Sequence, residues 1–131
     1  MISVQNVTRA ISFLCIAILS GCAGQYQAYD GVKLPSEKVA VVKGVTNILP
    51  LTTSLSISSV DGKKMSPYQE SIEVLPGRHV IGIQYHFHGG GGIFANGEAI
   101  VDAQAGKTYQ LGSKSEGNLV TFFVTEEVNK K

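Results

Sequence analysis

Short stretches of β-type sequence, separated by turn residues, run through most of this chain. Residues 54–60 alternate between apolar side chains and serines, and residues 78–88 form the longest stretch of this kind. Asp61-Gly62 and Pro76-Gly77 are turn dipeptides. Beyond residue 21, no window holds a helical period for two turns. This pattern predicts an all-β fold, a single small antiparallel β-sandwich of about seven strands, with a small β-barrel as the alternative.

The strand signal is carried by a series of separate segments. They are residues 38–43, 54–60, 71–75, 78–88, 97–103, 108–111 and 118–125. Residues 38–43 are β-branched and nearly all apolar, which predicts a central strand. Residues 118–125 are apolar on both faces, so we expect them inside the sandwich.

The first 22 residues have the organisation of a secretory signal peptide, for which a helix is expected. Arg9 precedes an apolar run over residues 10–19, which is shorter than the roughly 20 residues that span a bilayer. The run ends in Leu19-Ser20-Gly21-Cys22. This order of an aliphatic residue, two small residues and a cysteine resembles the lipobox of bacterial lipoproteins. The resemblance implies cleavage between Gly21 and Cys22 and a diacylglycerol on the thiol of Cys22. The alternative is an ordinary secretory signal with a later cut near Cys22-Ala23-Gly24.

A lipid on Cys22 would decide where the protein resides. One acyl chain binds a membrane only marginally, so stable attachment needs more than one. A diacylglycerol together with an acyl chain on the new amino group meets that condition. Ala23, and not Asp, follows the cysteine. By resemblance to lipoproteins of Gram-negative bacteria, this favours the outer membrane facing the periplasm, with the outer leaflet of the inner membrane as the alternative.

Three regions follow from these signals. Residues 1–21 are the predicted signal peptide, residues 22–36 a lipidated N-terminus and tether, and residues 37–131 the β-sandwich domain. Tyr29-Asp30-Gly31 and Leu34-Pro35 suggest that the tether turns and lies on the domain surface. For residues 23–28, a flexible spacer is the alternative.

Charge and cysteine content exclude several classes of function. Of 11 Lys and Arg residues only Arg9 lies in residues 1–21, so the mature chain would have 10 basic and 10 acidic residues and no net charge. With no basic patch, a nucleic-acid partner is not expected. Cys15 would leave with the signal peptide and Cys22 would be consumed by lipidation. Thiol catalysis and a cysteine metal site are then excluded.

The middle of the chain resembles a known family of β domains. Val60-Asp61-Gly62, followed by Leu75-Pro76-Gly77 and His79, resembles a pattern of PEGA-like domains. Residues 29–35 are also similar to the Tyr-x-Gly-x-x-Leu-Pro opening of small proteobacterial lipoproteins, with the glycine displaced. Met65-Ser66-Pro67 stands where a PEGA domain has Gly-x-Thr-Pro. The resemblance implies a β-sandwich in the cell envelope and no catalytic residues.

All the histidines lie within ten residues of one another, at positions 79, 86 and 88. A strand places His86 and His88 on one face, roughly 6–7 Å apart. Two such imidazoles can share Zn²⁺ or Cu²⁺, with Glu98 or Asp102 of the next strand as a third ligand. The alternative is a solvated polar strand face. His79 should point to the opposite face and pack on or bond to the Pro-Gly turn.

The glycine run after His88 is the remaining motif. His88-Gly89-Gly90-Gly91-Gly92 resembles the oxyanion loop of lipases and esterases, but residues 112–116 lack the last Gly of a Gly-x-Ser-x-Gly nucleophile motif. We expect a mobile hairpin tip over residues 89–96, on which Ile93 and Phe94 are either tucked under or offered to a partner.

Taken together, these features predict a non-enzymatic, membrane-anchored lipoprotein of the bacterial envelope. Its β-sandwich would bind a protein or a cell-wall component. The alternative is a periplasmic metal-binding module that uses His86 and His88.

Overall fold

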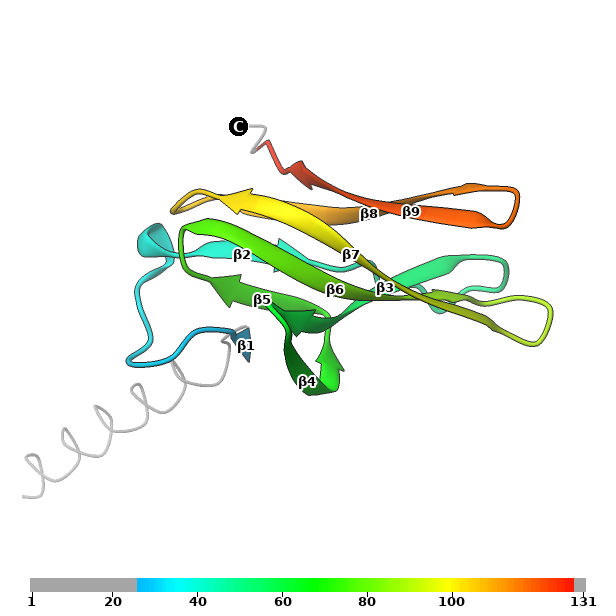
Figure 1. Cartoon of the computed structure of the whole chain (residues 1–131), viewed down its shortest axis with the longest axis horizontal. Coiled ribbons are helices and arrows are strands. Elements are labelled where there is room, and N and C mark those ends of the chain that lie inside the picture. The colour runs from blue at the N-terminus through cyan, green and yellow to red at the C-terminus, as the bar shows by residue number, and fades with distance from the viewer. Residues whose placement is uncertain (1–25, 129–131) are drawn as a thin grey trace, which may run out of the picture.

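The computed structural model describes residues 26–128, which fold into two facing β-sheets (Figure 1). The strands are β1 (Tyr26–Gln27), β2 (Ala40–Lys43), β3 (Thr53–Val60), β4 (Lys63–Gln69), β5 (Ser71–Val74), β6 (Gly77–Phe87), β7 (Ile93–Ala103), β8 (Thr108–Glu116) and β9 (Leu119–Glu126), and a short 3-10 helix, η1 (Ser36–Lys38), precedes β2. One sheet has the order β1-β5-β2-β8-β9 and the other β4-β3-β6-β7. The predicted β-sandwich is therefore confirmed, and the strands do not close into a barrel.

The four-stranded sheet is antiparallel throughout, as expected, whereas the five-stranded sheet is mixed. In the five-stranded sheet β1 runs parallel to β5, and β2 runs parallel to β8. Parallel neighbours need a long crossover connection. Between β2 and β8 the chain forms β5 and all four strands of the other sheet, so most of the crossover lies in the other layer of the sandwich.

Two strands were not predicted from the sequence. β1 has only 2 residues, too few to show a period. β4 contains Lys63, Lys64 and Pro67, which are residues that sheets place on their edges because they discourage further pairing. β4 is an edge strand of the four-stranded sheet, and its composition fits that position.

The prediction that residues 118–125 lie inside the sandwich is wrong. β9 is an edge strand of the five-stranded sheet, and none of its residues is fully buried. Its apolar side chains alternate between the two faces of the sheet. Phe122 fits inward where Gly97 has no side chain, and Phe123 lies outward over Gly112.

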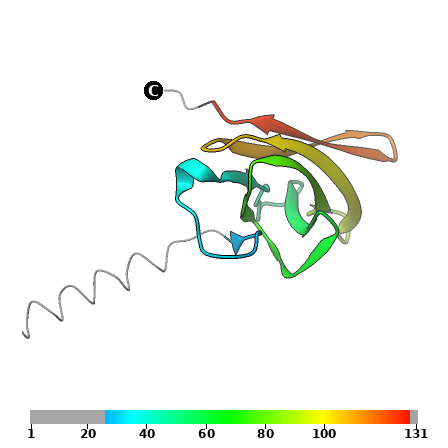
Figure 2. The same cartoon turned by 60° about the vertical axis from the view of Figure 1, so that its left-hand side comes forward.

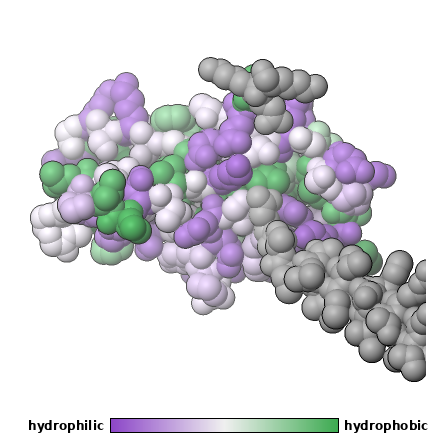
Figure 3. Space-filling view, turned by 180° about the vertical axis from the view of Figure 1, so that it is seen from behind, coloured by the Kyte–Doolittle hydropathy of each residue, from purple (hydrophilic) through white to green (hydrophobic). Residues whose placement is uncertain are grey.

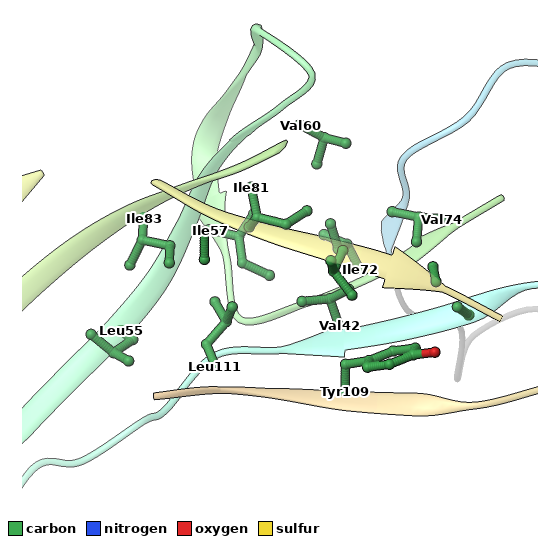
Figure 4. Packing of buried hydrophobic residues seen from close by; sticks show 14 of the residues in the cluster. Val42, Leu55, Ile57, Val60, Ile72, Val74, Ile81, Ile83, Tyr109 and Leu111 are labelled. Carbon is green, nitrogen blue, oxygen red and sulfur yellow. The ribbon is translucent and has the colours of Figure 1, made fainter. Parts of the chain in front are cut away.

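The core forms between the inner faces of the two sheets (Figure 4). Its labelled members are Val42, Leu55, Ile57, Val60, Ile72, Val74, Ile81, Ile83, Tyr109 and Leu111. The alternation predicted for residues 54–60 and 78–88 correctly places Leu55 and Ile57, and Ile81 and Ile83, in this core. β7 packs against β9, and the contact of these two strands closes one side of the sandwich (Figure 2).

A hydrogen-bonded pair joins the two predicted turns at one end of the four-stranded sheet. His79 Nδ1 lies 2.7 Å from Asp61 Oδ2, and His79 Nε2 lies 2.6 Å from the carbonyl oxygen of Leu75. The second oxygen of Asp61 accepts a hydrogen bond of 2.8 Å from Val80 N–H. His79 therefore bonds to the turn, as predicted. Asp61 and His79 together hold the β3–β4 and β5–β6 connections side by side.

The environment of Asp61 favours its ionised form. Partial burial raises the pKa of the carboxyl, but the hydrogen bonds from His79 and Val80 and the charge of His79 outweigh it, so the pKa lies below its ordinary value. Because this pKa is lower in the folded than in the unfolded chain, ionised Asp61 stabilises the fold at any pH above the unfolded-state pKa of about 4. This contribution is lost as the pH falls through the folded-state pKa.

We predict that Asp61→Asn lowers the free energy of unfolding by about 1 kcal/mol at pH 7, because it removes a charge-assisted hydrogen bond at a half-exposed site. Asn tolerates the positive φ of 50° at this position. Urea denaturation should show the difference between variant and wild type shrinking as the pH falls below about 4, as Asp61 becomes protonated. Asp30→Asn is the control, because Asp30 is fully exposed. Equal stability of Asp61→Asn and wild type at pH 7 would show that the Asp61–His79 pair does not stabilise the fold.

Candidate functional site

The predicted lipidation and cleavage residues, Cys22 and Gly21, lie outside the described residues. The description begins at Tyr26, the fourth residue after Cys22. Within residues 26–128, no helix is long and apolar enough to cross a membrane.

The part of the predicted tether that the structure describes is folded onto the domain. β1 adds to the edge of the five-stranded sheet beside β5, and Ala28 N–H donates to the carbonyl of Glu73. The Tyr29 hydroxyl accepts a hydrogen bond of 2.9 Å from Leu34 N–H, so this stretch turns and lies on the surface as expected. Only three residues of sequence, 23–25, therefore separate Cys22 from the folded unit.

An open hollow of the described surface lies across the four-stranded sheet. Its volume is about 620 Å³. We call it the sheet groove, and its lining residues are Ser58, Ser59, Lys64, Met65, Ser66, Tyr68, Gly82, Asn96, Gly97 and Glu98. Gly82 forms part of the floor, where a Cβ atom would collide with the Ser59 hydroxyl. Tyr68 on β4 and Glu98 on β7 come from the two edge strands of this sheet.

Most of the side chains that line the sheet groove are polar and have no hydrogen-bond or ion-pair partner among the described residues. Within residues 26–128, the side chains of Ser58, Ser59, Lys64, Ser66, Tyr68, Asn96 and Glu98 make no hydrogen bond or ion pair with one another or with other residues. They supply hydroxyl, amide, ammonium and carboxylate groups, that is, both donors and acceptors. The one cation and the one anion balance, so the groove has no net charge.

Most of the backbone of the groove floor is paired within the sheet. β3 and β6 are inner strands with a neighbour on both sides, although the pairing of β3 with β4 is interrupted between Ile57 and Ser59. A peptide that binds by strand addition needs a row of unpaired backbone groups at a sheet edge. We therefore expect recognition in the sheet groove to rely mainly on side chains.

Glu98 was predicted as a third metal ligand beside His86, and this prediction is wrong. The register places Glu98 opposite Gly82, four residues along β6 from His86, whereas Phe94 lies opposite His86. Four strand residues span about 13 Å. The alternative, Asp102, lies opposite Arg78 and is farther still. Glu98 lines the sheet groove instead.

His86 and His88 do come together, as their spacing predicts. Their ring centroids are 4.0 Å apart, and the ring of His86 also stacks on Phe94 at 4.2 Å. Phe94 and Ile93 belong to β7 and not to the mobile tip that was expected, because β7 begins at Ile93. Within residues 26–128, no group of three or more His, Cys, Asp and Glu residues is arranged to hold a metal ion.

Hydrogen bonding indicates which nitrogen of His88 is available. Ser54 Oγ lies 2.8 Å from His88 Nε2 and donates its proton to the carbonyl of Asn47 at 3.0 Å. The hydroxyl has one proton, so the bond to His88 requires a proton on Nε2. In the neutral ring Nδ1 is then the acceptor, and a second partner on the other nitrogen is typical of histidine metal ligands.

The glycine run forms the turn between β6 and β7. Gly90, Gly91 and Gly92 all have positive φ, which explains why side chains are missing there. This turn lies beside the β2–β3 connection, since Leu51 N–H donates to the carbonyl of His88. Large apolar side chains are exposed here, namely Ile48, Leu49, Leu51, Ile93 and Phe94. Figure 3 shows hydrophobic residues at this end of the molecule, on the left.

Sequence reasoning missed the sheet groove because its parts are far apart in the chain. The groove residues of β4 lie in a segment that was not predicted as a strand. The only earlier signal was the serine face of residues 54–60. Glu98 and Asn96 could be placed beside these serines only once the pairing of β3, β6 and β7 was known.

Comparison of the chain with protein-family models, with curated proteins and with solved structures finds no match.

Proposed function

We propose that this protein is a non-enzymatic lipoprotein of the bacterial envelope, attached through a lipid on Cys22, that binds a cell-wall glycan in the sheet groove. The observation that carries the proposal is the groove itself, where uncommitted polar side chains from β3, β4 and β7 converge over Gly82. Ala23 after the lipobox favours the outer membrane, facing the periplasm, over the outer leaflet of the inner membrane.

The position of β1 supports a domain held close to the lipid surface. Three residues lie between Cys22 and β1 in the sequence, and four Cα steps extend at most about 14 Å. A sandwich on so short a connection would stay beside the membrane that anchors it. A cell-wall polymer in the same compartment is then a ligand within reach.

The chemistry of the sheet groove favours a glycan over a protein. Hydroxyl, amide and carboxylate groups can pair with the hydroxyl and acetamido groups of a sugar chain, which carries many donors and acceptors and little charge. Tyr68 has 47% of its surface exposed, and its ring offers a flat apolar face beside a polar tip. The floor strands β3 and β6 have neighbours on both sides and so offer no continuous row of free backbone groups, which disfavours an extended peptide.

For the anchor, we predict that Cys22→Ser abolishes incorporation of labelled fatty acid and releases the protein from carbonate-washed membranes. Cys15→Ser is the matched control and should leave both properties unchanged, because Cys15 would be removed with the signal peptide. A wild-type protein without label, and soluble after carbonate washing, would overturn the lipidation of Cys22.

For the groove, we predict that the detergent-solubilised protein sediments with purified sacculi and binds chitotetraose, an oligomer of N-acetylglucosamine. Tyr68→Ala should weaken both at least tenfold. Tyr26→Ala is the matched control, since Tyr26 is exposed to a similar degree, 44%, and lies outside the groove. Equal binding by the two variants, or no binding by wild type, would overturn the glycan site and leave the lipid anchor untouched.

A second candidate function is metal binding by His86 and His88, with solvent completing the coordination. The observation that favours it is the 4.0 Å separation of the two rings, with His88 oriented by Ser54. We predict that Zn²⁺ or Cu²⁺ binds with a dissociation constant below about 100 μM at pH 7.5, and that the affinity falls as the pH is lowered, because imidazole must be neutral to bind a metal. NMR should show Zn²⁺ shifting the ring signals of His86 and His88 but not those of His79. Unchanged affinity in His86→Ala/His88→Ala would exclude the site.

A further inference from the structure

Of the four edge strands of the two sheets, β4 and β1 discourage further pairing, whereas β7 has 11 residues and β9 has 8. β4 carries lysines and a proline, and β1 is only 2 residues long. β9 is different, because it has 8 residues without lysine, proline or glycine, and it pairs with β8 in unbroken register. Long, regular edge strands of this composition readily pair with a further strand unless they are covered.

The free backbone groups of β9 can be assigned from its pairing with β8. Glu127 N–H donates to the carbonyl of Thr108, so residues 119, 121, 123, 125 and 127 direct their backbone groups toward β8. The alternate residues Val120, Phe122, Val124 and Glu126 therefore direct N–H and C=O away from the sheet. They form a row that another antiparallel strand can use.

On the outer face of β9, the nearest neighbours on either side of Phe123 are identical. Thr121 and Thr125 flank it at equal distance, and Phe123 has 46% of its surface exposed. We propose that β9 pairs with β9 of a second copy of this chain, antiparallel and centred on Phe123, to make one continuous sheet across a two-fold axis. Such an interface is self-complementary, as two-fold symmetry requires.

This register makes favourable pairs at its centre and brings no like charges together at its ends. Phe123 lies opposite its own copy, and each Thr121 lies opposite Thr125 of the other chain, which are aromatic and Thr–Thr pairs of the kind that stabilise sheets. Glu126 and Glu127 lie opposite Val120 and Leu119, so no like charges meet. Both carboxylates also have cations in their own chain, at 3.0 Å from Lys107 and 3.5 Å from Lys43.

Cysteine cross-linking of the full chain in the envelope tests the register directly. In Phe123→Cys the two thiols lie in one non-hydrogen-bonded pair, with Cα atoms about 4.5 Å apart, which a disulfide can bridge. Thr121→Cys or Thr125→Cys alone places like thiols about 14 Å apart and should give no dimer. Co-expression of a Thr121→Cys chain with a Thr125→Cys chain should give a disulfide-linked dimer. The wild-type chain controls for Cys15 and Cys22.

A charge introduced at the centre of the interface gives a second test that needs no oxidation. Phe123→Lys places two lysines face to face and should weaken dimerisation at least tenfold in analytical ultracentrifugation. Leu119→Lys is the matched control, because it meets Glu127 and should dimerise as well as wild type. A monomeric wild type, or dimers from Thr121→Cys alone with none from Phe123→Cys, would overturn the proposal. Protease resistance confirms that each variant is folded.

Discussion

The pairing of β3 with β6 is the constraint on which the rest of this structure depends. These two inner strands supply Leu55, Ile57, Ile81 and Ile83, which are at most 2% exposed, to the core. Their outer faces form the floor of the sheet groove. Removing either strand would separate β4 from β7, and the groove walls and the core would be lost together. Stability and the proposed binding site thus share one set of backbone hydrogen bonds.

A shift of register within β3 gives this pair its two different faces. The pairing slips between Ile57 and Ser59 on both sides of the strand. The extra residue of a β-bulge interrupts strict alternation. As a result the buried positions run Leu55, Ile57 and Val60, while Ser58 and Ser59 both line the groove. The collision that a Cβ at Gly82 would make with Ser59 explains the glycine opposite the bulge.

Much of the fold could be predicted because strand periodicity is a local property. Each of the segments expected to be strands is one, and His79 bonds to the turn that its position suggested. Errors arose where sheet position mattered. The apolar character of residues 118–125 suits an edge strand with Phe122 inside and Phe123 outside, and this cannot be told from a central strand without the fold. β4 was missed because edge residues resemble loop residues in composition.

The sequence alone determined which side chains of the alternating strands β3 and β6 face the core, where the chain turns beside them, and the expectation of a lipid on Cys22. These properties depend on neighbours within a few residues, through period-two alternation, turn geometry and the order of residues around the cysteine. Only the tertiary structure decided that Tyr68, Ser59 and Glu98 share one groove, that Glu98 lies apart from His86, and that β9 is a free edge. Those facts depend on strand order and register, which are set by pairing between distant segments and by packing of the two sheets.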